Sequence, residues 1–158
     1  MTTAPIAPFT NHLPVRVSFG DGAAHTLPQL IVEAGATRVL VLTDKDIETY
    51  NPAAGAVLDT LAGSGLTVVR LEKAPGEPTI DMVDDVTVRM RAEEVDAVVA
   101  LGGGSVIDTA KAARLCRQQG LSFAGFLDSE RRYPAPDTPL FAVPTTAGTG
   151  SEVSGGSV

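Results

Sequence analysis

Four strand-like segments that alternate with helical segments constrain the fold of this chain more than any other feature, and three of them, at residues 39–42, 97–101 and 140–143, are unbroken apolar runs. Unbroken apolar runs of this length are typical of strands that are buried on both faces of a sheet. When such strands alternate with helices, they form a parallel sheet that is covered by helices on both faces. We therefore predict an α/β fold with strands at residues 39–42, 66–71, 97–101 and 140–143.

The segments between these runs carry the start and stop signals of helices. We predict helices at residues 26–34, 53–62, 79–93 and 106–118. Pro28 suits the first turn of the first helix, and Gly35 closes it. Asn51 is a good N-cap for the second helix, Gly63 is its stop, and Thr79 caps the third. Four apolar positions of the third helix fall on one face: Ile80, Val83, Val86 and Met90.

The remaining segments are predicted to be extended or irregular. Residues 1–14 contain three prolines and form an extended lead-in. Residues 15–19 alternate apolar and polar side chains, as a half-buried strand does. Residues 121–138 are polar and contain prolines, so we expect a surface connection there.

Composition limits the classes of protein that this chain can represent. Its 158 residues suit one domain, residues 1–158, and 44% hydrophobic content supports a buried core. The formal net charge of −7 argues against a nucleic-acid partner, which would require a basic surface. We expect no membrane partner and a cytoplasmic location, since neither a signal peptide nor a long apolar span is visible. The single cysteine, Cys116, lies in a helical run and is predicted to be a buried small hydrophobe.

Three unusual segments follow predicted strands directly. Asp44 follows the first strand, residues 102–105 (Gly-Gly-Gly-Ser) follow the third, and residues 145–151 follow the fourth. In parallel sheets, ligands bind at the carboxyl ends of the strands. This coincidence is the strongest indication of a binding site that the residues alone provide.

The glycine-rich segment predicts a phosphate site. Without side chains, Gly103 and Gly104 let a ligand approach the backbone, and a helix start presents unpaired N–H groups to an anion. We predict that Ser105 is the N-cap and that Asp108 completes a capping box with it. The alternative is an ordinary glycine turn with a helix cap. The segment matches neither the Gly-x-Gly-x-x-Gly pattern nor a Walker loop. Lys111 either reaches Asp108 or extends into solvent, and a solvated helical lysine is the favoured interpretation.

Asp44 is a candidate for binding the ribose of an adenosine nucleotide. A carboxylate at a strand end can accept hydrogen bonds from both ribose hydroxyls and repels a 2′-phosphate, which favours NAD over NADP. The alternative is a solvated aspartate that ends a strand. In the common dinucleotide fingerprint the acid follows the glycines, whereas here it precedes them.

Residues 145–151 form a loop that is rich in hydroxyl groups. Hydroxyls and backbone N–H groups of such a loop can surround a nucleotide, although a plain strand-to-loop turn is the alternative. The candidate residues in this loop are Thr145, Thr146, Thr149 and Ser151.

The two histidines, His12 and His25, lack the spacing of a metal pair, so both are interpreted as surface residues. No Ser-His-Asp or Cys-His set is evident. We therefore assign neither a catalytic residue nor a metal ligand in this chain.

Two long segments resemble the signatures of the iron-containing (group III) alcohol dehydrogenases. They are residues 102–111 (GGGSVIDTAK) and residues 144–153 (PTTAGTGSEV). The opening Val17-x-Phe19-Gly20-x-Gly22 and the strand that ends in Thr43-Asp44 agree as well. The resemblance covers essentially the whole chain.

The resemblance implies a Rossmann-like, dehydroquinate synthase-like N-terminal domain that binds NAD. It implies that Asp44 contacts the adenosine ribose and that Gly103, Gly104 and Ser105 contact the pyrophosphate. It further implies that the hydroxyls of residues 145–151 line the rest of the nucleotide. Glu77 stands where the family commonly has Asn, which argues against a direct cofactor contact there.

In this family an Asp and three His in a helical domain bind Fe²⁺ or Zn²⁺, and that domain is absent from this sequence. We therefore expect an NAD-binding portion of an alcohol dehydrogenase that is inactive alone and meets an alcohol or aldehyde only when the helical domain is supplied. A stand-alone nucleotide-binding or oligomerising module is the alternative, and maleylacetate reductase and glycerol dehydrogenase are alternative subfamilies. We also expect a homo-oligomer, because loss of a packed domain exposes apolar surface.

Overall fold

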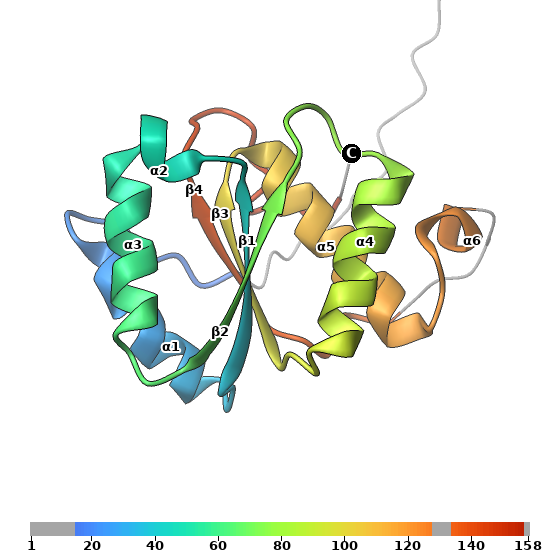
Figure 1. The fold of residues 1–158 in the computed structure, drawn as a ribbon, viewed down its shortest axis with the longest axis horizontal. Helices are drawn as coiled ribbons and strands as arrows, with labels where there is room; N and C mark the ends of the chain where they lie inside the picture. Colours follow the sequence, from blue (N-terminus) through green and yellow to red (C-terminus); the bar gives the residue numbers. More distant parts are fainter. Residues whose placement is uncertain (1–14, 128–133, 157–158) are drawn as a thin grey trace, which may run out of the picture.

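A four-stranded parallel sheet forms the centre of the molecule in the computed structural model, which describes residues 15–127 and 134–156 (Figure 1). The strand order is β2-β1-β3-β4. All four predicted strands are confirmed, each within a few residues of its predicted ends. Their bounds are β1 Arg38–Asp44, β2 Thr67–Lys73, β3 Ala97–Gly102 and β4 Leu140–Pro144.

Helices connect the strands, and the four predicted helices are present. The helical elements are η1 Ala23–Thr26, α1 Leu27–Glu33, α2 Ile47–Tyr50, α3 Pro52–Ala62, α4 Ile80–Ala92, α5 Gly104–Gln119 and α6 Phe123–Leu127. Within the described part of the chain, none of these is long and apolar enough to cross a membrane.

The helices cover both faces of the sheet, so the predicted Rossmann-like α/β class is confirmed. Helices α1 and α3 lie on one face, and α4 and α5 lie on the other (Figure 1). Alternate residues of β1 point to opposite faces: Val39 and Val41 pack with α1 and α3, whereas Leu40 and Leu42 pack with α4 and α5. A strand with apolar residues at every position therefore contributes to two cores at once, which explains the unbroken apolar runs.

Side-chain caps define where two of the helices begin. The Asn51 side chain accepts a hydrogen bond from the N–H of Ala54, and Pro52 occupies the first turn of α3. The Thr79 hydroxyl accepts a hydrogen bond from the N–H of Met82 at the start of α4. Both predicted caps are confirmed, because each satisfies an N–H group that the helix itself leaves unpaired.

Two local predictions are wrong. Residues 15–19 form no strand, and the apolar side chains of Val15, Val17 and Phe19 are exposed. An alternating pattern requires a neighbouring strand and a core to cover its apolar side, and this segment has neither in the described structure. Part of the predicted surface connection is helical, as α6. On the predicted apolar face of α4, Val83, Val86 and Met90 are buried, and Ile80 in the first turn is 43% exposed.

The predicted lead-in, residues 1–14, lies outside the described residues, as does His12. His25 is exposed, and its Nδ1 atom lies 3.1 Å from Thr60 Oγ1, which agrees with a surface histidine. Cys116 is buried as predicted, and burial raises the pKa of its thiol to about 11.

Candidate functional site

The candidate site lies at the carboxyl edge of the sheet, where β1 and β3 are neighbours. From β1 the chain leads to β2 on one side, and it then crosses back to β3 on the other side. Such a reversal opens a crevice beyond the carboxyl ends of the two central strands, where doubly wound sheets bind ligands. The strands end here at Asp44, Gly102 and Pro144, so the three predicted segments do meet at one edge.

Gly102 allows strand β3 to pass directly under the start of α5. A Cβ atom at this position would lie 2.6 Å from Val106 Cγ2, which is shorter than any real contact. The same Cβ would lie 3.2 Å from Asp44 Oδ2. Any side chain at Gly102 would therefore push the helix away, and the absence of one brings the Asp44 carboxylate next to the glycine segment.

Gly103 and Gly104 lie beneath the hydroxyl-rich loop. A Cβ atom at Gly103 would lie 3.3 Å from Thr146 Oγ1, and one at Gly104 would lie 3.0 Å from both Ser151 Oγ and Thr149 Cβ. The loop is held to the sheet by the N–H of Thr145, which donates to Gly102 O over 2.9 Å. The structure thus brings the second and third predicted segments into direct contact.

The predicted role of Ser105 as an N-cap is wrong. Helix α5 begins at Gly104, and Gly103 is its N-cap without a side-chain bond. Ser105 lies inside the first turn, and its hydroxyl donates to Gly76 O over 2.8 Å. Glycine is an acceptable N-cap residue, and because Gly103 has no side chain the hydroxyl-rich loop can lie close to the helix start.

The predicted capping box with Asp108 is wrong for the same reason, because Asp108 is engaged elsewhere. Its Oδ2 accepts a hydrogen bond from Ser151 Oγ over 3.3 Å, and its Oδ1 pairs with Lys111 Nζ at 3.1 Å. Asp108 is buried, so a paired and hydrogen-bonded state is the one that its carboxylate tolerates. It acts on the loop of residues 145–151 by fixing Ser151.

Lys111 is not the solvated lysine that the sequence indicated. Only 12% of its side chain is exposed, and Nζ donates to Asp108 Oδ1, Ser154 Oγ and Gly156 O. The last two bonds are 3.0 and 2.7 Å long. Lys111 thereby ties the segment after the hydroxyl-rich loop to the middle of α5.

Lys73 is a site residue that sequence reasoning missed. Its ammonium lies 3.8 Å from Asp44 Oδ1, and its side chain is only 1% exposed, whereas that of Asp44 is 28% exposed. The signal that could have indicated it is its register: Lys73 ends β2 directly opposite Asp44 at the end of β1.

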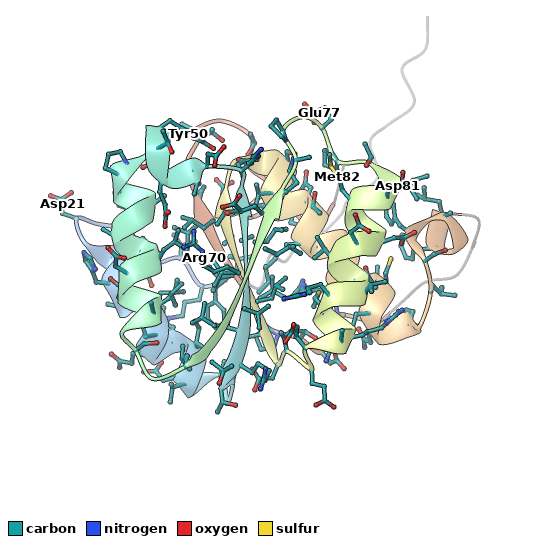
Figure 2. All side chains as sticks on the ribbon, in the orientation of Figure 1. Asp21, Tyr50, Arg70, Glu77, Asp81 and Met82 are labelled. Carbon is teal, nitrogen blue, oxygen red and sulfur yellow. The ribbon has the colours of Figure 1, made fainter. Side chains whose placement is uncertain are left out.

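Two exposed side chains border this edge of the sheet. Figure 2 shows Tyr50 of α2 and Glu77 of the loop after β2 at the end of the molecule where the strands terminate. Burial raises the pKa of the Tyr50 hydroxyl, and the nearby carboxylates of Asp44 and Asp46 raise it further. A phenol hydroxyl can donate a hydrogen bond, so Tyr50 adds a donor at this edge of the sheet.

A metal centre finds no support among the side chains of residues 15–127 and 134–156. Nowhere in these ranges do three His, Cys, Asp or Glu residues come together in a way that could hold an ion. Divalent iron or zinc requires several such ligands. The described residues therefore do not fit the metal that the family resemblance implies.

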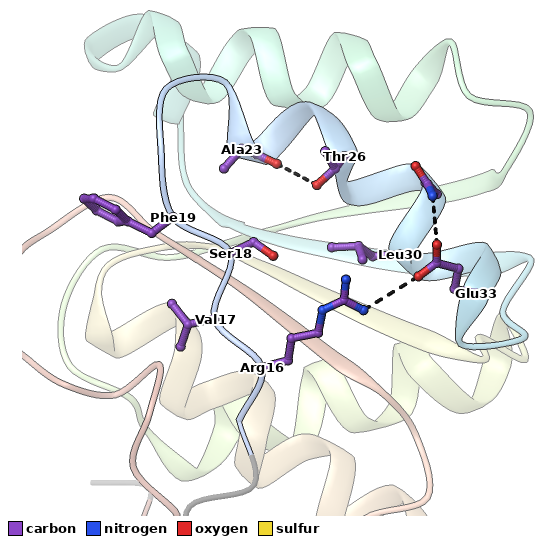
Figure 3. Close-up of a pocket in the computed structure, with 9 residues that line it drawn as sticks. Arg16, Val17, Ser18, Phe19, Ala23, Thr26, Leu30 and Glu33 are labelled. Carbon is purple, nitrogen blue, oxygen red and sulfur yellow. Dashed lines mark hydrogen bonds and ion pairs between the residues drawn. The ribbon is translucent and has the colours of Figure 1, made fainter.

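A hollow in the described structure lies away from this edge (Figure 3). It has a volume of about 460 Å³ and lies between residues 16–19 and the segment from η1 to α1. Arg16 and Glu33 form an ion pair across it at 3.7 Å, and both side chains are largely exposed. A shallow hollow with a solvated ion pair has no group suited to chemistry, so we place the functional site at the carboxyl edge instead.

Comparisons with known proteins agree with the fold described above. The family model described as iron-containing alcohol dehydrogenase matches residues 14–158. The hydroxyacid-oxoacid transhydrogenase of Xenopus tropicalis is 33% identical over 88% of this chain and 31% of its own length. The alcohol dehydrogenase of Thermococcus barophilus is 30% identical over 92% of this chain and 39% of its own length.

Among solved structures, the sulfoacetaldehyde reductase of Bifidobacterium kashiwanohense, crystallised in complex with NAD⁺, superimposes with a TM-score of 0.81. It is 29% identical, and the match covers 94% of this chain and 39% of that structure. The chain therefore spans about a third of the length of the relatives that it matches. With a family model that covers nearly all of its residues and a matching fold, this chain belongs to the iron-containing alcohol dehydrogenase family.

Proposed function

We propose that this chain is the NAD-binding portion of a metal-dependent alcohol dehydrogenase. The observation that carries the proposal is the convergence of Asp44, the bare start of α5 and the hydroxyl-rich loop where β1, β3 and β4 end. Three segments that are far apart in sequence supply a carboxylate, free backbone and hydroxyls at one crevice. Those are the groups that a ribose and a pyrophosphate require.

Each group has a distinct task in this proposal. Asp44 accepts hydrogen bonds from the adenosine ribose, and the backbone of Gly103 and Gly104 binds the pyrophosphate. The helix dipole of the 16-residue α5 adds to the attraction for the anion. Thr145, Thr146 and Thr149 line the nucleotide, and Thr146 and Thr149 have the exposure to do so. When bound, NAD accepts a hydride from the carbon of the alcohol.

Other predicted site residues act by holding these groups in place. Ser105 fixes Gly76 through its hydroxyl, Asp108 fixes Ser151, and Lys111 fixes Asp108. Because Gly104 contacts both Thr149 and Ser151, the position of the loop sets how much of the helix start stays accessible. These three side chains are positioning residues and need not touch the nucleotide.

Calorimetry with NAD, NADP and ADP tests the proposal on the 158-residue chain. We expect NAD and ADP to bind, and we expect Asp44→Asn to weaken NAD roughly tenfold because a charged ribose acceptor is lost. Asp21→Asn is the matched control, since Asp21 is exposed and lies away from Tyr50 and Glu77 (Figure 2). Equal weakening by both variants, or absence of NAD binding by the unmodified chain, would refute the assignment of the site.

A second assay addresses catalysis. The described residues include no metal-binding cluster, so we expect no reduction of NAD by an alcohol with added Fe²⁺ or Zn²⁺. Robust NAD reduction by chain verified to contain only these residues would overturn this part of the proposal. Binding of NAD without turnover would support an NAD-binding portion that depends on further residues for its chemistry.

We also infer that the chain associates with itself. Val17 is 67% exposed and Phe19 is fully exposed, and both belong to a segment with the alternating pattern of a strand. Strand β4 is an apolar edge strand of the described sheet, and an apolar edge favours pairing with another chain. Light scattering should show an oligomer that Phe19→Asp weakens. A clean monomer at high concentration would contradict the inference.

A further inference from the structure

Lys73 is a buried lysine that the proposed function leaves unexplained. Only 4% of the residue is exposed, in a position at the end of β2 that an apolar residue could occupy. Burying an ammonium group costs free energy unless hydrogen bonds and an opposite charge compensate. A lysine held in such a place therefore calls for a role that an apolar side chain could not perform.

The contacts of Lys73 link all parts of one side of the crevice. Its Nζ donates to Ala74 O over 2.9 Å and to Gly76 O over 2.7 Å, and it forms the ion pair with Asp44. Gly76 O also accepts the hydroxyl of Ser105. One ammonium group thus contacts the Asp44 carboxylate and the loop after β2, and through Gly76 it is linked to the first turn of α5.

We propose that Lys73 is a specificity-determining residue of the nucleotide site, and that its charge sets how strongly Asp44 rejects a 2′-phosphate. The proposal rests on the proposed function, because it assumes that Asp44 faces the ribose. It goes further in naming which groups decide between NAD and NADP. Asp44 alone would present one uncompensated negative charge to the 2′ position, and Lys73 partly cancels that charge.

The ammonium of Lys73 is buried, whereas the carboxylate of Asp44 is partly exposed. A charge in a buried position is screened less by water and salt than an exposed one, so the field of Lys73 extends to the crevice above Asp44. A 2′-phosphate brings close to two negative charges at neutral pH. Removal of the Lys73 charge leaves the edge more negative, and a phosphorylated ribose is then penalised more than a plain ribose.

A purely structural role for Lys73 leads to a different expectation. If the ammonium only tethers the loop after β2 through Ala74 and Gly76, its loss disturbs the site for every nucleotide alike. The affinities for NAD and NADP then fall by the same factor, and their ratio stays constant. The ratio of the two dissociation constants therefore separates the two roles.

The experiment measures the Kd of NAD and of NADP for the 158-residue chain and three variants. Lys73→Gln keeps a donor for Gly76 O and removes the charge, whereas Lys73→Met removes both. We expect the ratio of Kd for NADP to Kd for NAD to rise roughly tenfold in both variants, the size expected of one charge acting over about 10 Å at a partly solvated site. Only Lys73→Met should also weaken NAD itself.

Lys45→Gln is the matched control. Lys45 follows Asp44 in sequence and carries the same charge, but its side chain is exposed and therefore screened. In Lys45→Gln the ratio of Kd for NADP to Kd for NAD should change by less than about twofold. Thermal unfolding of each variant checks that it folds, and Lys73→Gln gives the answer even where Lys73→Met does not fold.

The outcomes separate this inference from the proposed function. Absence of NAD binding by the unmodified chain refutes the proposed function. Binding of NAD by the unmodified chain together with an unchanged ratio in Lys73→Gln refutes the role of Lys73 alone. A ratio that rises equally in Lys45→Gln also refutes it, because any nearby charge would then have the same effect.

Discussion

The two ends of the parallel sheet each carry an aspartate, and the two carboxylates are used differently. At the amino end, Asp96 precedes β3 and accepts hydrogen bonds from the N–H groups of Thr37 and Arg38, each 2.8 Å long, and from the Thr37 hydroxyl at 3.0 Å. At the carboxyl end, Asp44 contacts Lys73 at 3.8 Å, beyond hydrogen-bond range. One carboxylate is fully engaged with the fold, whereas the other keeps acceptor capacity toward the crevice.

The basic side chains near the two ends differ in the same way. Arg117 donates to Val95 O and Thr138 Oγ1 over 2.9 and 2.8 Å, which joins the starts of β3 and β4. Lys73 instead holds the loop after β2, and Lys111 holds the segment that follows the hydroxyl-rich loop. Polar groups at the amino end therefore connect strands, whereas those at the carboxyl end hold the loops around the candidate site.

Gly102→Ala should have the largest effect on the free energy of unfolding, because this part of the carboxyl end is tightly packed. The new Cβ would lie 2.6 Å from Val106 Cγ2 and 2.9 Å from Val106 Cβ, in a fully buried region. Overpacking of this kind costs about 3 kcal/mol of the free energy of unfolding. Urea denaturation measures this loss of stability. Gly65→Ala is not a suitable control, because Gly65 has a positive φ of 82° and alanine would be strained there.

A better control for that variant is Gly55→Ala, in the interior of α3. A Cβ atom there would meet nothing closer than 3.9 Å, and alanine is the better helix former. Gly55→Ala should therefore be neutral or stabilising by up to about 1 kcal/mol. A Gly102→Ala protein as stable as the Gly55→Ala protein would show that α5 can move away from β3 at little cost.

Asp96→Ala tests the amino end directly. The change leaves the N–H groups of Thr37 and Arg38 without their acceptor and should cost about 2 kcal/mol of the free energy of unfolding. The affinity for NAD should stay within about twofold, since the opposite edge of the sheet is undisturbed. Weakened nucleotide binding in a protein that is still folded would contradict the view that the amino end of the sheet serves only stability.

The pH dependence of stability gives a second measure of Asp96. Burial raises the pKa of this carboxyl, but hydrogen bonds from Thr37 and Arg38 outweigh burial and leave the pKa below its ordinary value of 3.8. A depressed pKa in the folded state means that the carboxylate stabilises the protein at pH values above 3.8. This stabilisation is lost as the pH falls below 3.8 and through the folded pKa. The stability difference between the unmodified protein and Asp96→Ala should therefore shrink in acid; a constant difference would contradict it.

Gly104→Ala should separate binding from stability at the carboxyl end. A Cβ atom would lie 3.0 Å from Thr149 Cβ and Ser151 Oγ, so the loop must shift, and its exposed threonines can do so. We expect a loss of less than about 1 kcal/mol in stability, partly offset by the better helix propensity of alanine. The affinity for NAD should fall at least roughly tenfold, because the methyl group displaces the hydroxyl-rich loop from the start of α5. Calorimetry and urea denaturation together decide, and a loss of stability without a loss of affinity would reverse the interpretation.

Sequence reasoning recovered those parts of the molecule that depend on local patterns. Apolar runs predicted three of the four strands, and Asn51 and Thr79 predicted the starts of α3 and α4, because both signals act within a few residues. The edge at which the site lies followed as well, since parallel strands place their carboxyl ends together.

The contacts made by long side chains could not be predicted in this way. Lys73 ends an ordinary strand, and its ammonium binds carbonyl oxygens of the loop that follows directly. Lys111 occupies an ordinary helical position, and its ammonium binds residues 154 and 156, which lie far away in the sequence. The same limit explains residues 15–19, whose alternating pattern needs a partner strand that the pattern itself does not specify. These contacts depend on how the chain folds beyond the local pattern. The same holds for the N-cap of α5, which is Gly103 and not the predicted Ser105.

Ser105→Ala should have the smallest effect, and it tests that last correction. If Ser105 were the N-cap of α5, its loss would cost about 1 kcal/mol of the free energy of unfolding. In the structure its hydroxyl donates to Gly76 O, which also accepts from Lys73, so the carbonyl keeps a partner after the substitution. Alanine favours the helix interior, and we therefore expect a change within about 0.5 kcal/mol. The affinity for NAD should fall by no more than about threefold, since one of two tethers to Gly76 remains. Urea denaturation that shows the full loss of a cap would restore Ser105 to the helix boundary and remove the argument that the start of α5 is kept bare for a ligand.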